Sequence, residues 1–101
     1  MAQFDVYRMT GATTYPLVVD IQADTHSKLG SRVVVPMVPR ARYHQPATRI
    51  TPIVTIRGDD YVLVFPSLAS VPTTALTDVV GSIAEQRPTL ISAIDLLITG
   101  S

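Results

Sequence analysis

The 101-residue chain contains no cysteine, and it has little charge of either sign. Without cysteine there is no disulfide framework, no thiolate metal site and no thiol nucleophile, which suits a reducing compartment. Eight basic residues balance eight acidic ones, so the formal net charge at pH 7 is zero. A neutral chain lacks the general electrostatic attraction behind non-specific binding to nucleic acids or membrane surfaces.

Sequence signals for export and for common enzymes are also lacking. No basic segment followed by an apolar run opens the chain, and no stretch approaches about 18 consecutive apolar residues. We therefore expect a cytoplasmic protein that does not enter a membrane. There is no glycine-rich phosphate loop, nucleophile elbow or His-Glu-x-x-His pattern. His26 and His44 fall in predicted loops without further ligands at metal spacing, so we expect neither a metal nor a cofactor.

Hydrophobic residues, in contrast, make up 47% of the chain and charged residues only 16%. The length fits one domain over residues 1–101. Such a composition is more apolar than a small monomer needs, which predicts that a second copy covers part of the surface. We therefore expect a homodimer.

Basic residues are concentrated in the middle of the chain, where no Asp or Glu occurs between Asp24 and Asp59. Six of the eight lie there: Lys28, Arg32, Arg40, Arg42, Arg49 and Arg57. Arginines together with Tyr43 and His44 in the loop at 39–51 could contact RNA phosphates and stack on a base. An RNA cleavage site would also need a positioned acid/base pair, which the spacing does not supply. We favour a solvated polar loop.

Short β-rich runs separated by turn residues predict five or six strands, at residues 3–9, 15–22, 32–38, 53–56, 61–65 and 73–80. Residues 10–14 and 23–31 are expected to be a turn and a loop. Pro36 cannot donate a ladder hydrogen bond, so its strand should lie at an edge or break at a bulge. Asp59 and Asp60 are interpreted as turn formers after Gly58. Asp20 is expected to face solvent or to cap a loop.

The last fourteen residues predict a helix that starts at Pro88 and Thr89 and stops at Gly100. Five apolar residues at helical spacing form a stripe that should face the core: Leu90, Ile91, Ile94, Leu97 and Ile98. A rotation of 100° per residue places Ser92, Asp95 and Thr99 on the opposite side. Ala93 and Leu96 extend the apolar surface beyond one packed face, and they are expected to serve dimerisation.

Strands followed by one helix predict an α+β fold, with a strongly bent antiparallel sheet or partly closed barrel against which the helix packs. Several motifs then occur in order along the whole chain. They are Gln3-Phe4-x-Val6-Tyr7, Val19-Asp20-x-Gln22-x-Asp24, Arg32-x-Val34-x-Pro36, Ala69-Ser70-Val71-Pro72, and Ala93-Ile94-Asp95-x-Leu97 followed by Gly100. In these motifs the sequence resembles the CcdB family of toxins from bacterial toxin–antitoxin modules.

The resemblance implies a small SH3-like barrel of the type shared with the Kid and MazF toxins, and a symmetric homodimer. It implies a protein that is not an enzyme, that binds the A subunit of DNA gyrase and that traps gyrase on cleaved DNA. It also implies release by a small CcdA-like antitoxin with a disordered segment. DNA would be contacted only indirectly, through the antitoxin, as in transcription autoregulation.

In the family, the gyrase-facing residues lie on the last helix and on a C-terminal Trp-Gly-Ile tripeptide. The corresponding tripeptide here is Thr99, Gly100 and Ser101, of which only the glycine matches. The family's polar helix contacts correspond to Ser92 and Asp95, the same side that helical geometry places away from the core. The antitoxin contacts are not assigned to residues, although the acid-free middle of the chain suits an acidic disordered segment.

Two other functions remain open from the sequence. The shared fold and the basic loop would also suit an endoribonuclease toxin of the Kid or MazF type. The altered tail would suit a non-toxic relative that retains only antitoxin or repressor binding.

Overall fold

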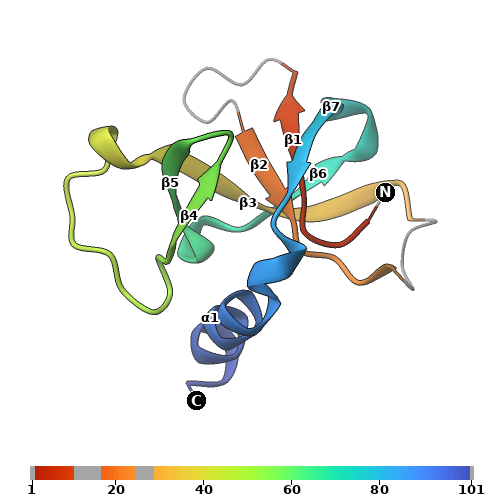
Figure 1. Cartoon of the computed structure of the whole chain (residues 1–101). Helices are drawn as coiled ribbons and strands as arrows, with labels where there is room; N and C mark the ends of the chain where they lie inside the picture. Colours follow the sequence, from red (N-terminus) through yellow and green to blue (C-terminus); the bar gives the residue numbers. More distant parts are fainter. Residues whose placement is uncertain (1, 11–16, 25–28, 101) are drawn as a thin grey trace.

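The computed structural model describes residues 2–10, 17–24 and 29–100. Within these ranges, seven β-strands precede one α-helix (Figure 1). The strands are β1 (Asp5–Met9), β2 (Leu17–Asp20), β3 (Ser31–Pro39), β4 (Ile53–Ile56), β5 (Asp59–Leu63), β6 (Ala69–Pro72) and β7 (Leu76–Ser82), and the helix is α1 (Arg87–Thr99). The predicted turn at 10–14 and the first residues of the predicted strand at 15–22 lie almost wholly outside the described residues.

All strand pairs are antiparallel, and the sheet runs in the order β4-β5-β3-β2-β1-β7, with β6 added beside β3. The sheet curls into a half-barrel, and α1 extends from one end of it (Figure 1). The predicted α+β fold with a strongly bent antiparallel sheet is confirmed. The expected antiparallel pairing of the first two strands is also confirmed, with Val6 opposite Val19.

Pro36 does not mark an edge strand, because β3 lies in the middle of the sheet between β2 on one side and β5 and β6 on the other. The ladder to β6 ends at Val34, and the ladder to β5 begins at Met37. The carbonyl of Pro36 accepts a hydrogen bond from the Val64 amide at 3.1 Å. The missing N–H of the proline therefore falls where β3 changes partners, and no ladder bond is lost there.

The main core lies on the inner face of the curled sheet, where alternate residues of neighbouring strands meet. Val6, Val19 and Val35 from β1, β2 and β3 belong to it, and Leu90 and Ala93 of α1 join them. A smaller cluster, formed by Tyr7, Val18, Val34 and Leu76, is buried on the other face. The central strands are therefore covered on both faces, so Tyr7 is buried where simple alternation predicted a half-buried strand.

Helix α1 begins at Arg87 and ends before Gly100. Gly100 completes the C-terminal cap: it has a left-handed φ of 79°, and its backbone N–H donates a hydrogen bond to the Leu96 carbonyl at 3.0 Å. The predicted helix stop is confirmed. The predicted core stripe is partly wrong, because Ile98 is 67% exposed. The expectation that Ala93 serves dimerisation is also wrong, because Ala93 is fully buried in the core of the chain. The helix packs against the core from Leu90 to Leu97, and its C-terminal end projects away from the sheet (Figure 1).

The β4–β5 hairpin turns on Arg57 and Gly58, which both have positive φ angles of 52° and 84°. Two consecutive residues of this kind form the tight two-residue turn whose twist suits a hairpin. Asp59 and Asp60 are therefore strand residues, not turn formers. Asp60 lies opposite Thr55, and the Thr55 hydroxyl donates to its carboxylate at 2.6 Å.

Candidate functional site

Four residues form an exposed strip along α1, which we call the α1 seam: Ser92, Asp95, Thr99 and Gly100. Asp95, Thr99 and Gly100 are exposed, and Ser92 is partly buried. The Thr99 hydroxyl donates to the Asp95 carbonyl at 2.7 Å, which fixes its side chain along the helix. The structure therefore brings four of the five predicted site residues together on one side of the helix. The fifth, Ser101, lies outside the described residues.

A groove of about 620 Å³ runs beside the α1 seam, between the β3–β4 loop and the first turns of the helix. Its lining comprises Ala47, Thr48, Arg49, Pro52, Pro88, Thr89 and Ser92. An Arg49 Nη2 donates to the Ser92 hydroxyl at 3.4 Å, so the loop brings a positive charge next to the seam. The sequence had placed Arg49 only in the separate basic loop, because nothing local connects it to a helix 43 residues away.

The five residues proposed for RNA contacts do not form one cluster. Arg40 and Arg42 occupy a short 3-10 turn, and Arg40 donates to the Tyr43 carbonyl of the same loop at 3.0 Å. Arg49 instead lies against α1. The described part of the chain contains no group of three His, Cys, Asp or Glu residues that could hold a metal ion. His26 lies outside the described residues.

The start of α1 is tied to the N-terminal segment. Arg87 donates to the Gln3 side-chain oxygen at 2.9 Å, and its guanidinium lies 5.7 Å from the centre of the Phe4 ring. Phe4 adopts a φ of 71°, which is unfavourable for a bulky side chain, and it is 1% exposed. The backbone N–H of Gln3 in turn donates to the Asp24 carboxylate at 2.7 Å. The N-terminus thus connects the helix to the segment after β2.

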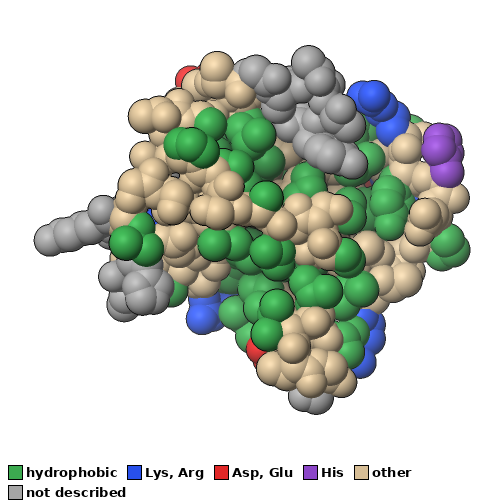
Figure 2. Space-filling view, turned by 180° about the vertical axis from the view of Figure 1, so that it is seen from behind, with side chains coloured by type: hydrophobic (Ala, Val, Ile, Leu, Met, Phe, Trp, Pro, Cys, Tyr) green, Lys and Arg blue, Asp and Glu red, His purple; other side chains and the backbone are tan. Residues whose placement is uncertain are grey.

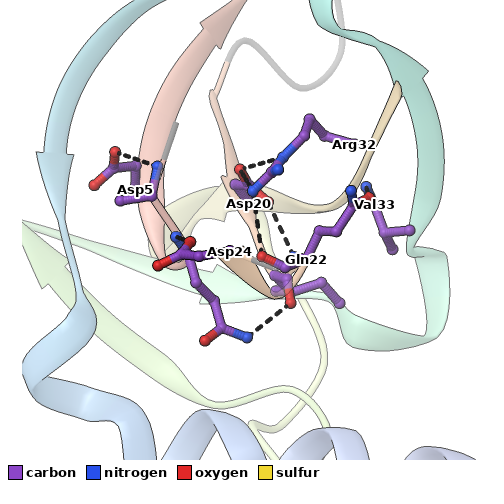
Figure 3. Close-up of polar contacts among 9 residues, drawn as sticks. Asp5, Asp20, Gln22, Asp24, Arg32 and Val33 are labelled. Atoms are coloured by element: carbon purple, nitrogen blue, oxygen red, sulfur yellow. Dashed lines mark hydrogen bonds and ion pairs between the residues drawn. The ribbon is translucent and has the colours of Figure 1, made fainter. Parts of the chain in front are cut away.

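Asp20 and Arg32 form an ion pair that is fully buried, with both side chains 0% exposed (Figure 3). Arg32 Nη2 and Nε lie 2.7 Å and 2.8 Å from Asp20 Oδ2. Asp20 Oδ1 accepts a hydrogen bond from the backbone N–H of Gln22 at 2.9 Å. The Gln22 side chain accepts the Val33 amide at 3.1 Å. Of the two alternatives expected for Asp20, exposure to solvent is therefore wrong, whereas capping of the loop after β2 is confirmed by the bond from the Gln22 backbone N–H. A carboxylate can be buried here because its charge is paired and both oxygens are hydrogen-bonded.

One feature of this buried network stays energetically costly. Arg32 Nη1 is buried without a hydrogen-bond partner among the described residues. Burial raises the pKa of Tyr7, and the negative charges of Asp5 and Asp20 raise that pKa further, against the opposing effect of Arg32. A sequence signal for the pair existed: Asp20 interrupts an apolar segment, and Arg32, with the opposite charge, begins the next apolar run.

The curled half-barrel with one C-terminal helix is the fold of the CcdB toxins. A family model described as CcdB protein matches residues 3–100. The chain belongs to the CcdB family, which confirms the resemblance carried by the five motifs. Membership implies a toxin of a toxin–antitoxin module. In the part of the chain that the structure describes, no helix is long and apolar enough to span a membrane.

Proposed function

We propose that the protein binds the A subunit of DNA gyrase through the α1 seam and poisons gyrase by trapping it on cleaved DNA. The observation that carries this proposal is the exposed polar strip on a helix whose opposite side is fixed in the core. Because the helix is already held in place, its residues lose little conformational freedom when a partner binds. The toxin acts by binding and not by catalysis, and it acts in the cytoplasm.

The chemistry of the seam differs from that of an interface with a large aromatic anchor. Thr99 is small, and the exposed apolar group in the last turn is Ile98. Asp95 supplies a negative charge, and Arg49 supplies a positive charge across Ser92. We therefore expect binding to depend on polar contacts from Asp95 and on close approach of a partner backbone at Gly100.

A homodimer would present two seams to gyrase A, which is itself a two-fold symmetric dimer. Hydrophobic side chains gather across the middle of the face shown in Figure 2, where a second copy could cover them. Exposed large apolar residues include Leu29, Ile53 and Val79. A CcdA-like antitoxin would release gyrase, and the module would contact DNA only through that antitoxin.

Induction in bacteria tests this function. The chain is expressed in a strain with wild-type gyrase and in a strain with a resistant gyrase A subunit. Rescue by the resistant subunit is the expected result. Undiminished toxicity with shortened messenger RNA would contradict it and assign an endoribonuclease. Absence of toxicity together with tight antitoxin binding would contradict it and assign a non-toxic relative.

A further inference from the structure

A small pocket of about 170 Å³ opens where the two ends of the curled sheet approach each other. We call it the barrel-mouth pocket, and its lining comprises Arg8, Leu17, Ile56, Arg57, Asp59, Tyr61 and Val80. Leu17, Ile56 and Val80 belong to the buried main core, so they give the pocket an apolar floor. Its remaining residues are two exposed arginines, an exposed aspartate and a partly buried tyrosine.

The pocket is held in shape by contacts between the β4–β5 hairpin and β7. Arg57 Nε donates to the Val80 carbonyl at 3.0 Å, and Ile56 packs against Gly81 so closely that an added Cβ would lie 3.0 Å from its Cδ1. Arg57 adopts a left-handed φ of 52° at a turn position that normally favours Asn, Asp or Gly. An arginine in this unfavourable conformation, fixed through Nε, is a preorganised group beside the pocket.

The charges around the pocket are not neutralised by one another. Within residues 2–10, 17–24 and 29–100, the only ion pair joins Asp20 and Arg32, so neither Arg8 nor Arg57 is paired with Asp59. The bond to Val80 uses only the Nε of Arg57. Two guanidinium groups therefore line a small pocket with an apolar floor. A carboxylate between them would form charge-assisted hydrogen bonds with both.

We propose that the barrel-mouth pocket binds an acidic side chain from an extended peptide segment of the antitoxin, with a neighbouring apolar side chain on the floor. This proposal rests on the toxin–antitoxin part of the proposed function. A peptide is favoured over a nucleic acid because the apolar floor takes an apolar side chain and the Asp59 carboxylate can accept a peptide N–H. The zero net charge of the chain removes the general attraction for a polyanionic nucleic-acid backbone.

Titration of the ¹⁵N-labelled full chain, followed by NMR, tests the proposal directly. The probe is the blocked peptide acetyl-Ala-Leu-Glu-Leu-Ala-amide, and the matched control carries glutamine in place of glutamate. We expect the glutamate peptide to shift the amides of Ile56, Gly58 and Val80. Loss of the carboxylate should weaken binding about tenfold, as expected for a charge-assisted contact.

Two variants remove one guanidinium each. Arg8→Gln lies on an exposed strand position, and Arg57→Asn suits the left-handed turn, so both should fold. Each should weaken the glutamate peptide about tenfold and leave the glutamine peptide unchanged. Arg42→Gln removes the same charge from the exposed 3-10 turn, outside the pocket, and should change neither affinity. Unfolding midpoints of all samples show that the variants are folded.

Several results would overturn the proposal. Equal binding of the two peptides would show that the pocket does not recognise a carboxylate. Unchanged affinity in both Arg8→Gln and Arg57→Asn would show the same. Displacement of the glutamate peptide by equimolar inorganic phosphate would show a general anion site. Tighter binding of hexathymidylate at the same amides would assign a nucleic acid. None of these measurements involves gyrase, so failure here is distinguishable from failure of the gyrase proposal.

Discussion

Asp20 and Arg32 show how a single pair of side chains holds the segment between β2 and β3. Their charges are buried together, and the Asp20 carboxylate also fixes the Gln22 backbone. Removal of one partner leaves the other charge buried without compensation, which costs far more than the loss of an exposed pair. Asp20, Gln22 and Arg32, which belong to the family motifs, thus have a structural role.

Asp20→Ala tests this buried pair. The substitution should lower the free energy of unfolding by about 3–5 kcal/mol, because Arg32 would remain charged and buried. Urea unfolding followed by circular dichroism measures the change. Asp78→Ala, at an exposed position of β7, is the matched control and should change stability by no more than about 0.5 kcal/mol. Equal costs for the two substitutions would show that the pair contributes nothing special.

Tyr7 predicts a dependence of stability on alkaline pH. Its pKa is raised above the usual 10.0, mainly by burial. The folded state therefore keeps the phenol proton at a pH where the unfolded state begins to lose it. The free energy of unfolding should fall as the pH rises from 10 through the raised folded-state pKa. Urea unfolding between pH 8 and pH 11 should show a smaller fall in Tyr7→Phe. An identical pH dependence in the two proteins would contradict the burial effect.

At the residue scale, the sequence predicted what depends on helical geometry and missed what depends on tertiary packing. A rotation of 100° per residue placed Ser92, Asp95 and Thr99 on one side of the helix, as in the structure. The same geometry could not show that Arg49 reaches Ser92 from a distant loop. Exposure of Asp20 was wrong because alternation in a strand predicts exposure only when the opposite sheet face is open, whereas its capping of the following loop was one of the two expected alternatives.

At the scale of elements, the longer periodic segments were predictable. The helix was expected from residue 88 and begins at Arg87, and most predicted strands differ from the observed ones by a few residues. The short strand β6 was not predicted, because its four residues, which end at Pro72, show no alternation of their own. It forms because β3 offers a free ladder edge from Ser31 to Val34. Such pairing is set by distant residues, which a local pattern does not contain.

The contact between Gly81 and Ile56 predicts a measurable coupling between β7 and the β4–β5 hairpin. An added Cβ at Gly81 would lie 3.0 Å from Ile56 Cδ1, the atom that Ile56→Val removes. Gly81→Ala should therefore be less unfavourable in the Ile56→Val background, with an interaction energy of roughly 0.5–1 kcal/mol in a double-mutant cycle. Chemical unfolding of the four proteins measures it. Strictly additive changes would show that the two ends of the sheet do not meet in solution.

At the scale of the whole molecule, the apolar composition predicts a dimer. Light scattering at concentrations from micromolar to high micromolar should give twice the mass of one chain. The expected physical reason is burial of hydrophobic surface that one copy leaves exposed, such as Ile98 at 67% exposure. A monomeric mass at the highest concentration would contradict the predicted dimer. It would also contradict the proposal that two α1 seams bind a two-fold symmetric partner.

The most direct test of the central claim is the affinity of purified gyrase A subunit for the chain and for two seam variants. Stability and affinity are measured on the same samples. Gly100→Glu should cost about 1 kcal/mol of stability, because Gly100 has a left-handed φ and no atoms within 4 Å of an added Cβ. Asp95→Lys should stay within about 0.5 kcal/mol, because Asp95 is exposed.

Both variants should lose gyrase A binding while they remain folded at the temperature of the measurement. Arg42→Gln, at an exposed position in the β3–β4 loop, should bind like the unchanged chain. Loss of binding at nearly unchanged stability is the result that the α1 seam predicts. Gyrase A binding that survives both Asp95→Lys and Gly100→Glu would contradict the account and place the contact elsewhere on the chain.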